Sequence, residues 1–334
     1  MTSATFMSYY DDKLDTLQSL FGGEVRLDDN GLIVAGKRYP IVDDVILLLD
    51  PEQNPGSARD VGRSTGQLES FSADVQHTFG EEWTKYPEIL SEHKADFFDR
   101  YFDIVDLDSL RDKRICDLGC GIGRWSHFLA DEAREIVAVD FSEAIFIARK
   151  NLRQWNNILY FKADLTQLPF RDDCFDFLFC LGVLHHLPTD CLEELIRTSR
   201  LSPQLLVYLY YALDNRPFHF HLAFKLGDAA RRITSRIKSR TFRSVFTISV
   251  LLGVYYPLIA LGNVLRPFGL SAKVPLWEGY HGRGWKRIEQ DVYDRFFTSI
   301  EQRVTRKQIR TLEQTFSKVL VSERIPYWHF LCIR

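Results

Sequence analysis

The sequence predicts an α/β fold built on a doubly wound parallel sheet, and three observations support this prediction. Short apolar runs alternate with helical patterns between residues 114 and 210, which is typical of parallel strands joined by helices. A glycine-rich loop follows the first of these runs, where open parallel sheets bind their ligands. Two β-rich runs late in the sequence are only a few residues apart, which predicts an antiparallel terminal hairpin.

Ahead of this alternating region, residues 1–50 are predicted to form a small β module. Residues 31–42 have the pattern of a short β-hairpin, and an apolar run follows at 45–49. Residues 51–75 are rich in Gly, Pro, Ser and polar side chains and are predicted to be a linker. Aromatic and charged residues then recur at helical spacing over 79–102.

Five strands and three helices are predicted from the apolar periodicity that follows. The strands are expected at 114–117, 136–139, 158–161, 175–180 and 205–210. The helices are expected at 124–133, 142–155 and about 190–200, with Ser142 as the N-cap of the second helix. Since strand and helix alternate, the five strands are expected to lie parallel in one sheet.

The terminal hairpin is expected to complete a seven-stranded sheet. Its strands are predicted at 318–321 and 328–333, after a helix at 306–316. The fifth strand and this hairpin are separated by roughly a hundred residues, far more than a crossover helix requires. We therefore predict a core made of residues 76–213 and 313–334, interrupted by a helical cap insertion at 214–312 that covers a substrate.

Composition and charge exclude several classes of protein. With 46% hydrophobic and 26% charged residues the chain is globular, and a net charge of -3 gives no general attraction to nucleic acid. The first twelve residues have neither a basic region nor a long apolar run, so no secretory signal is expected. The six cysteines lack CxxC spacing and a partnering histidine cluster, so neither a metal site nor a disulfide framework is predicted. A reduced, cytoplasmic setting is expected.

The glycine-rich loop is the predicted ligand site. Gly119, Gly121 and Gly123 let the backbone turn tightly and approach a ligand, and the following helix presents unpaired N–H groups. The dinucleotide fingerprint GxGxxG would place its third glycine at position 124, which is Arg124. Asp117, two residues before the first glycine, also suits a cationic amino group better than a pyrophosphate.

The stretch DLGCGIGRW at 117–125 resembles motif I of the class I S-adenosylmethionine-dependent methyltransferases, of the small-molecule, type 11-like kind. The resemblance continues through VDFS at 139–142, KADLTQLPF at 162–170 and FDFLFCLGVLHHLP at 175–188. Four motifs in this order are specific together, and the match is close over about 117–210. The resemblance implies a Rossmann-like sheet, an enzyme, and S-adenosylmethionine as cofactor with S-adenosylhomocysteine as product.

Carried over to this sequence, these motifs assign a role to each matching residue. Asp117 is expected to interact with the methionine amino end, Asp140 to accept both ribose hydroxyls, and Asp164 to bond the adenine amino group. The other cofactor contacts that the resemblance implies are Gly119, Cys120, Gly121 and Gly123 in the loop, Phe141 and Leu165 about the base, and Cys180, Leu181 and Gly182 under the sulfonium. Asp140 and Asp164 could instead be simple helix or turn caps.

Methyl transfer from a sulfonium is an in-line displacement, for which alignment and exclusion of water matter most and a base is optional. His186 lies where similar methyltransferases carry a histidine near the acceptor, and it is the candidate base; it could instead anchor its loop. In the cap insertion His281 is a second candidate, within a cluster that could line a pocket or form an aromatic core. The candidate substrate contacts are His185, Tyr210, Trp277, Tyr280, Tyr293 and Arg295.

A stretch of 22 residues without a charge, 244–265, follows six Lys and Arg residues at 231–243. The length and the basic flank approach those of a transmembrane helix, yet both ends must return to one domain, which a single span cannot do. Two glycines and Pro257 interrupt the stretch, so two short buried cap helices broken at Pro257 are expected. The alternative is an interfacial segment that makes peripheral membrane contact through 231–265.

The apolar cap favours a lipophilic or natural-product acceptor, and O-methylation is the favoured reaction. Two alternatives stay open: an RNA methyltransferase that uses the basic stretch 231–243, and a non-catalytic nucleotide-binding scaffold. The acceptor molecule, the acceptor atom and the oligomeric state do not follow from the sequence, because fold and cofactor do not fix the substrate.

Overall fold

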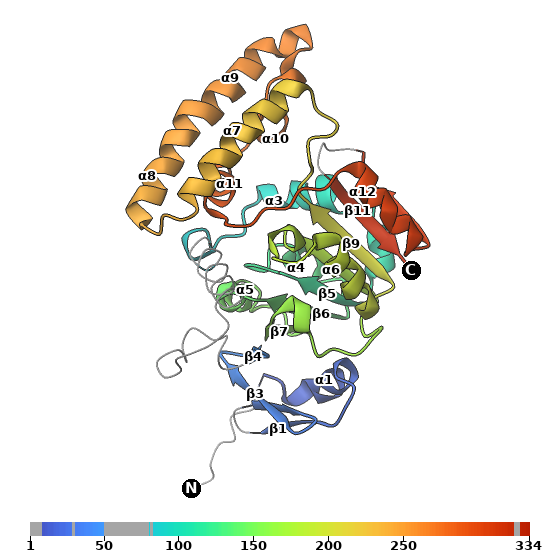
Figure 1. The fold of residues 1–334 in the computed structure, drawn as a ribbon. Coiled ribbons are helices and arrows are strands. Elements are labelled where there is room, and N and C mark those ends of the chain that lie inside the picture. Colours follow the sequence, from blue (N-terminus) through green and yellow to red (C-terminus); the bar gives the residue numbers. More distant parts are fainter. Residues whose placement is uncertain (1–8, 29–30, 50–79, 81–82, 324–327) are drawn as a thin grey trace. The chain divides into compact units, whose positions relative to one another are not determined.

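The computed structural model describes residues 9–28, 31–49, 80, 83–323 and 328–334. They form two compact units (Figure 1). The helical unit is Tyr211–Thr305, and the sheet unit combines Met1–Tyr210 with Arg306–Arg334. The sequence places these boundaries at 214 and 312, a few residues later. Its predicted linker at 51–75 lies outside the described residues.

The sheet unit is organised by an eleven-stranded sheet with the order β1-β2-β3-β4-β7-β6-β5-β8-β9-β11-β10. Its centre consists of five parallel strands that are almost wholly buried: β5 (Arg114–Leu118), β6 (Glu135–Asp140), β7 (Ile158–Lys162), β8 (Phe177–Leu181) and β9 (Gln204–Leu209). Continuous apolar strands of this kind are typical of parallel sheets covered on both faces. The predicted doubly wound sheet is confirmed.

The terminal hairpin closes one side of this sheet. β11 (Trp328–Ile333) pairs antiparallel with β9, and β10 (Lys318–Val321) pairs antiparallel with β11 at the edge. Both strands have the predicted bounds. The seven predicted strands therefore stand in the order β7-β6-β5-β8-β9-β11-β10.

Four further strands extend the sheet at its other side. These are β1 (Val25–Asp28), β2 (Gly31–Val34), β3 (Lys37–Val42) and β4 (Val45–Leu47), and the predicted hairpin at 31–42 is formed by β2 and β3. β4 pairs in parallel with β7, and the Tyr10 hydroxyl donates to the Asp44 carbonyl at 2.7 Å. The N-terminal strands thus continue the core sheet, which is why it has eleven strands rather than seven.

Six helices belong to the sheet unit as described: α1 (Leu14–Leu20), α3 (Glu92–Asp96), α4 (Ser126–Leu129), α5 (Ala144–Asn151), α6 (Cys191–Thr198) and α12 (Arg306–Thr311). The Asp190 carboxylate caps α6 by accepting the N–H groups of Leu192 and Glu193. The prediction for 124–133 is wrong in extent, since α4 has only four residues. Tighter i to i+3 bonds, such as that from the Glu132 N–H to the Leu129 carbonyl, replace the regular helix there.

The helix predicted over 79–102 is also wrong in extent, and Phe79 lies outside the described residues. Residues 86–90 are not helical. Pro87 has no N–H to donate and disfavours helical backbone at the residue before it, so the chain leaves the helix at this point. α3 begins at Glu92 and continues as a π-helical turn at Phe97–Tyr101.

The helical unit contains five α-helices: α7 (Phe218–Thr234), α8 (Arg240–Val250), α9 (Tyr256–Leu265), α10 (Trp277–Tyr280) and α11 (Trp285–Phe297). α11 packs against both α7 and α8, and α10 packs against α9. A π-helical turn, Leu251–Tyr255, joins α8 to α9 into one helix that spans Arg240–Phe268 (Figure 1).

The predicted break at Pro257 is therefore wrong. Pro257 lies in the first turn of α9, directly after the π turn, and the altered hydrogen-bonding of that turn lets the helix pass the missing N–H without ending. The predicted burial is wrong as well, because only 28% of the most apolar window of this helix is buried. Its length and composition would suffice to cross a membrane.

Candidate cofactor site

The predicted cofactor residues of the sheet unit gather at one edge of the sheet. Asp117 is the fourth residue of β5, Asp140 ends β6, Asp164 follows β7, and Leu181 ends β8. These four strands are neighbours, and the strand order reverses between β5 and β8. Since parallel strands end at the same edge, the three carboxylates and the glycine loop lie around the topological switch point.

The glycine loop after β5 has a backbone that only glycine adopts readily. Gly119 has φ +82°, and a Cβ there would lie 2.3 Å from a methyl carbon of Val183. The N–H groups of Gly119 and Cys120 both donate to the Val139 carbonyl, at 2.8 and 3.0 Å, which ties the loop to β6. The loop is thereby held against β6 as a backbone cradle, and the glycine at position 119 leaves room for Val183.

Asp140 organises the loop from the end of the neighbouring strand. Its Oδ2 accepts the Gly121 N–H at 2.8 Å, while Oδ1 accepts both the N–H and the hydroxyl of Ser142, at 2.8 and 2.7 Å. Burial raises the pKa of this carboxyl above its usual range, although the bonds from Ser142 and Gly121 oppose the shift. Asp140 is thus a turn cap, and Oδ2 keeps the capacity to accept a further hydroxyl.

Asp164 is likewise both a cap and a candidate ligand. Its Oδ1 accepts the N–H and the hydroxyl of Thr166, at 2.9 and 2.7 Å, and so caps the short turn at Leu165–Gln167. The side chain is half-buried, as are Phe141 and Leu165. The two interpretations left open by the sequence are compatible here, because a capped carboxylate is also a pre-oriented one.

Asp117 lies deepest of the three carboxylates, with 2% of its surface exposed. The Ser126 hydroxyl donates to its Oδ2 at 2.6 Å. Burial raises the pKa of Asp117 to about 7, against the opposing effect of Ser126. A buried carboxyl of this kind is stabilised in its charged form by a cation, and this suits the predicted contact with an amino group.

A second cluster, of histidines and tyrosines, lies after β8 and β9. The His185 ring stacks on Tyr210, with centroids 4.0 Å apart and an interplanar angle of 27°. The centroid of the His186 ring lies 4.1 Å from that of His185 and 5.6 Å from that of Tyr210, and both histidines are buried. The backbone N–H of His186 donates to the Val183 carbonyl at 2.9 Å, within the short turn Leu184–His186. The structure thus brings together three residues that the sequence predicts for catalysis and substrate contact.

The remaining candidates belong to the helical unit. Trp277 is buried, its indole N–H donates to Asn263 at 2.9 Å, and the exposed His281 stacks on it with centroids 4.0 Å apart. A Cβ at Gly262 would lie 2.1 Å from Trp277, so the indole fits into the side of α9. This packing favours the aromatic core over a pocket lining for Trp277.

Three other residues of the helical unit are also packed inside it. Tyr280 packs edge-on against Tyr255, and both rings are buried. Tyr293 accepts a hydrogen bond from the buried Arg243 at 3.2 Å. Arg295, two residues before the end of α11, is half-buried.

Sequence reasoning missed several side chains near the sheet edge. A Cβ at Gly121 would lie 3.3 Å from the Trp83 ring, and the Arg124 guanidinium lies 5.3 Å from that ring. Nothing in the sequence pattern distinguishes Trp83 from other aromatic residues of its segment. The buried pair of His329 Nε2 and Asp103 Oδ1, 2.5 Å apart, was also missed, although a histidine in the apolar strand β11 is a signal of a buried polar contact.

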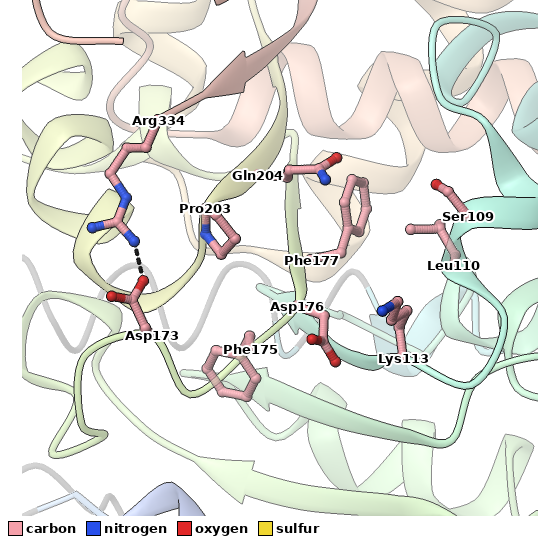
Figure 2. Close-up of a pocket in the computed structure, with 10 residues that line it drawn as sticks. All are labelled: Ser109, Leu110, Lys113, Asp173, Phe175, Asp176, Phe177, Pro203, Gln204 and Arg334. Carbon is pink, nitrogen blue, oxygen red and sulfur yellow. Dashed lines mark hydrogen bonds and ion pairs between the residues drawn. The ribbon is translucent and has the colours of Figure 1, made fainter. Parts of the chain in front are cut away.

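A separate cavity of about 650 Å³ lies at the amino-terminal edge of the sheet. Figure 2 shows its lining, which includes Lys113 before β5, Asp176 before β8 and Gln204 at the start of β9. Arg334 contacts Asp173 across one side of it. Because parallel sheets bind ligands at the opposite, carboxyl edge, this cavity is distinct from the candidate cofactor site.

Comparison with known proteins bears on this geometry. Residues 115–201 match the family described as methyltransferase domain. A demethylmenaquinone methyltransferase of Beutenbergia cavernae is 28% identical over 178 residues, which cover 51% of this chain and 73% of the relative. A ubiquinone biosynthesis O-methyltransferase of Coxiella burnetii is 29% identical over a stretch that covers 36% of this chain. A probable tRNA methyltransferase 9B of Homo sapiens is 26% identical over a stretch that covers 39% of this chain. The chain spans 51% and 28% of those two proteins.

The strand order, the carboxylates at its switch point and the family match agree. The chain contains a methyltransferase domain at residues 115–201, and this match supports the class I S-adenosylmethionine-dependent methyltransferase that the sequence motifs predict. The domain also supports the predictions that the protein is an enzyme and that S-adenosylmethionine is its cofactor. The relatives differ in acceptor, so the family does not identify the acceptor of this chain.

Proposed function

We propose that this protein transfers the methyl group of S-adenosylmethionine to a small, lipophilic acceptor, with a hydroxyl as the favoured acceptor group. The observation that carries the proposal is the set of three carboxylates, Asp117, Asp140 and Asp164, at the ends of three successive strands of the sheet. Demethylmenaquinone and ubiquinone methyltransferases among the relatives support an acceptor of this class.

The residues present fit the cofactor, as the glycine cradle and the buried Asp117 carboxyl indicate. Asp117 would pair with the amino group, the Asp140 carboxylate would accept ribose hydroxyls, and Asp164 would accept from the adenine amino group. Phe141 and Leu165 would pack about the base, while Cys180, Leu181 and Gly182 would pass under the sulfonium. When bound, the cofactor supplies an electrophilic methyl carbon, and the protein's task is to align the acceptor and exclude water.

His186 is the proposed base. A hydroxyl acceptor loses a proton as the oxygen–carbon bond forms, and a neutral imidazole accepts this proton. The stacked pair of His185 and Tyr210 restricts the space beside His186 and would hold the acceptor against it. His281, which lies on the surface of the helical unit and stacks on Trp277, is the weaker candidate.

The test is a methyl-transfer assay with labelled S-adenosylmethionine and a lipid extract, a polar small-molecule extract and total RNA as acceptor pools. We expect label in the lipid extract, lost in Asp140→Ala together with binding of S-adenosylhomocysteine. His186→Ala should lower transfer by about 10² to 10⁴ and leave cofactor affinity unchanged. Undiminished cofactor binding in Asp140→Ala would refute the site.

An RNA methyltransferase is the second candidate, favoured by the basic stretch 231–243 and by the tRNA methyltransferase relative. Against it, Arg231 and Arg243 are buried, which removes two of the six cations from the surface. Label in total RNA rather than in lipid would establish this alternative. Binding of S-adenosylhomocysteine without transfer to any pool would instead establish the non-catalytic scaffold.

A cytoplasmic enzyme that meets its acceptor at a membrane is consistent with this proposal. The sequence predicts peripheral membrane contact through residues 231–265, which would bring the enzyme to such an acceptor.

A further inference from the structure

The outer face of α7 in the helical unit is apolar. Phe218, Leu222, Leu226 and Ile233 are exposed by 79%, 50%, 67% and 68%. Their spacing of four, four and seven residues puts all four on one side of a helix that turns every 3.6 residues. An exposed large apolar residue is ordinary, but a full stripe of them along a helix indicates a contact surface.

The long helix Arg240–Phe268 carries a second stripe of the same kind. Its large apolar residues exposed by more than 40% are Val245 (60%), Ile248 (41%), Leu252 (55%), Val254 (45%), Leu261 (48%), Val264 (66%) and Phe268 (73%). Apart from Val254, they recur every three or four residues in each half of the helix. The π turn between them adds a residue to one turn, so exposed Pro257, five residues after Leu252, continues the stripe. The turn thus keeps the apolar residues of both halves near one face.

The fully buried side chains of α7 and α8 are polar, which reverses the usual pattern, whereas the π turn and α9 bury the apolar residues Leu251, Tyr255 and Ile259. Arg231 on α7 is buried and donates to the carbonyls of Thr298 and Ser299, at 3.0 and 2.9 Å. Arg243 and Thr247 on α8 are buried as well. A helix that buries arginine and threonine while exposing leucine, valine and phenylalanine has its apolar side arranged for a non-aqueous environment.

The surroundings of the stripes are strongly cationic. Residues 215–273 contain ten Lys and Arg and a single acidic residue, Asp228. Seven of these cations are exposed: Lys225, Arg232, Arg236, Lys238, Arg240, Arg266 and Lys273. Long basic side chains beside an apolar stripe can lie along it and place their charges at the level of lipid phosphates.

We propose that the helical unit docks on an anionic phospholipid surface, with α7 and the helix Arg240–Phe268 lying in the plane of the interface. The two stripes enter the acyl boundary and the exposed cations meet the phosphates. A second copy of this chain would bring the same positive charge against the patch, and RNA would not cover the apolar stripes. A span is disfavoured because the polar inner face of α8 is packed on α11.

Docking deepens the proposed function, since it would bring the enzyme to an acceptor dissolved in the membrane. The docking proposal rests on the proposed function only in assuming that the acceptor is lipophilic. Binding to vesicles is measured without cofactor or acceptor, so failure of docking and failure of methyl transfer are distinguishable.

The test is flotation of the full chain with vesicles of phosphatidylcholine alone or of equal parts phosphatidylcholine and phosphatidylglycerol. We expect the protein to bind the anionic vesicles. Its affinity for them should fall about fivefold for each basic residue whose charge is reversed by substitution or screened by salt. Ile233→Glu and Val264→Glu should abolish binding. Ile196→Glu, on α6 of the sheet unit and 39% exposed in the parent protein, is the matched control and should bind normally.

Insertion is tested by Val264→Cys labelled with an environment-sensitive fluorophore, which is selective because the six native cysteines are buried. The fluorescence should rise with anionic vesicles, whereas that of labelled Ile196→Cys should not. Unchanged melting temperatures would show that the exposed substitutions leave the fold intact. Binding that survives both glutamate variants, an absence of binding, or a dimer that Val264→Glu dissociates would each overturn the proposal.

Discussion

The carboxyl of Asp117 should make cofactor affinity depend on pH. Its pKa of about 7 reflects burial, so in the empty protein about half of the molecules carry a proton there at neutral pH. A cationic amino group binds the ionised form, and binding must therefore displace this proton. We expect the affinity for S-adenosylhomocysteine to fall about tenfold for each pH unit below 7, which is about 1.4 kcal/mol per unit.

The same shift affects the stability of the empty protein. The folded carboxyl keeps its proton up to about pH 7, while the unfolded chain loses it near the ordinary aspartate pKa of 3.8. The folded state thus binds more protons in this window, so the free energy of unfolding falls as pH rises through it. The whole difference corresponds to at most about 4 kcal/mol. Asp117→Asn should remove this decline and be the more stable protein at pH 8, yet bind cofactor at least about a hundredfold more weakly.

Isothermal titration calorimetry in two buffers of different ionisation enthalpy measures both affinity and the proton released. Ser126→Ala is the matched control, because loss of the Ser126 hydrogen bond should raise the pKa of Asp117 further and move the pH dependence upward. If the affinity of the parent protein did not change across pH 7, or if Asp117→Asn kept the same slope, the assigned contact would be refuted.

Three further substitutions test the two units separately. Gly119→Ala puts a Cβ at φ +82° against Val183, so cofactor binding should be lost at a cost in stability of about 1–3 kcal/mol. Gly262→Ala meets Trp277 instead and should destabilise the helical unit by about 1–3 kcal/mol while cofactor affinity, measured by calorimetry, stays unchanged. Asp103→Ala leaves the buried His329 without its acceptor, and chemical denaturation should show a loss of at least about 2 kcal/mol. An effect below experimental error in any of the three would contradict the packing described.

The sheet and its site were predictable because each depends on short-range pattern. β10 and β11 have the predicted bounds, since Ser317 and Ser322 flank the first apolar run and Pro326 precedes the second. Asp117, Asp140 and Asp164 were assigned through the resemblance of their motifs to those of class I methyltransferases, and the topology then brings them together at one edge of the sheet.

The features that could not be predicted depend on contacts between residues that are distant in sequence. The pairing of β4 with β7 joins residues more than a hundred positions apart, and no local pattern specifies it. The place of Trp83 beside the glycine loop is similarly non-local. The His329–Asp103 pair could have been suspected from a histidine in an apolar strand, but its partner could not.

The stretch 244–265 shows why hydropathy alone could not decide between burial and exposure. The amount of apolar surface is the same in either case, and only the direction it faces differs. That direction is set by the inner side of α8, where Arg243 bonds Tyr293 and the Ile237 carbonyl and so fixes which face meets α11. Once this polar contact is made, the helix can no longer bury Val245, Ile248 and Leu252 within its own unit. An apolar stripe left outside in this way is evidence about the environment of the protein, because water alone gives no reason to keep it.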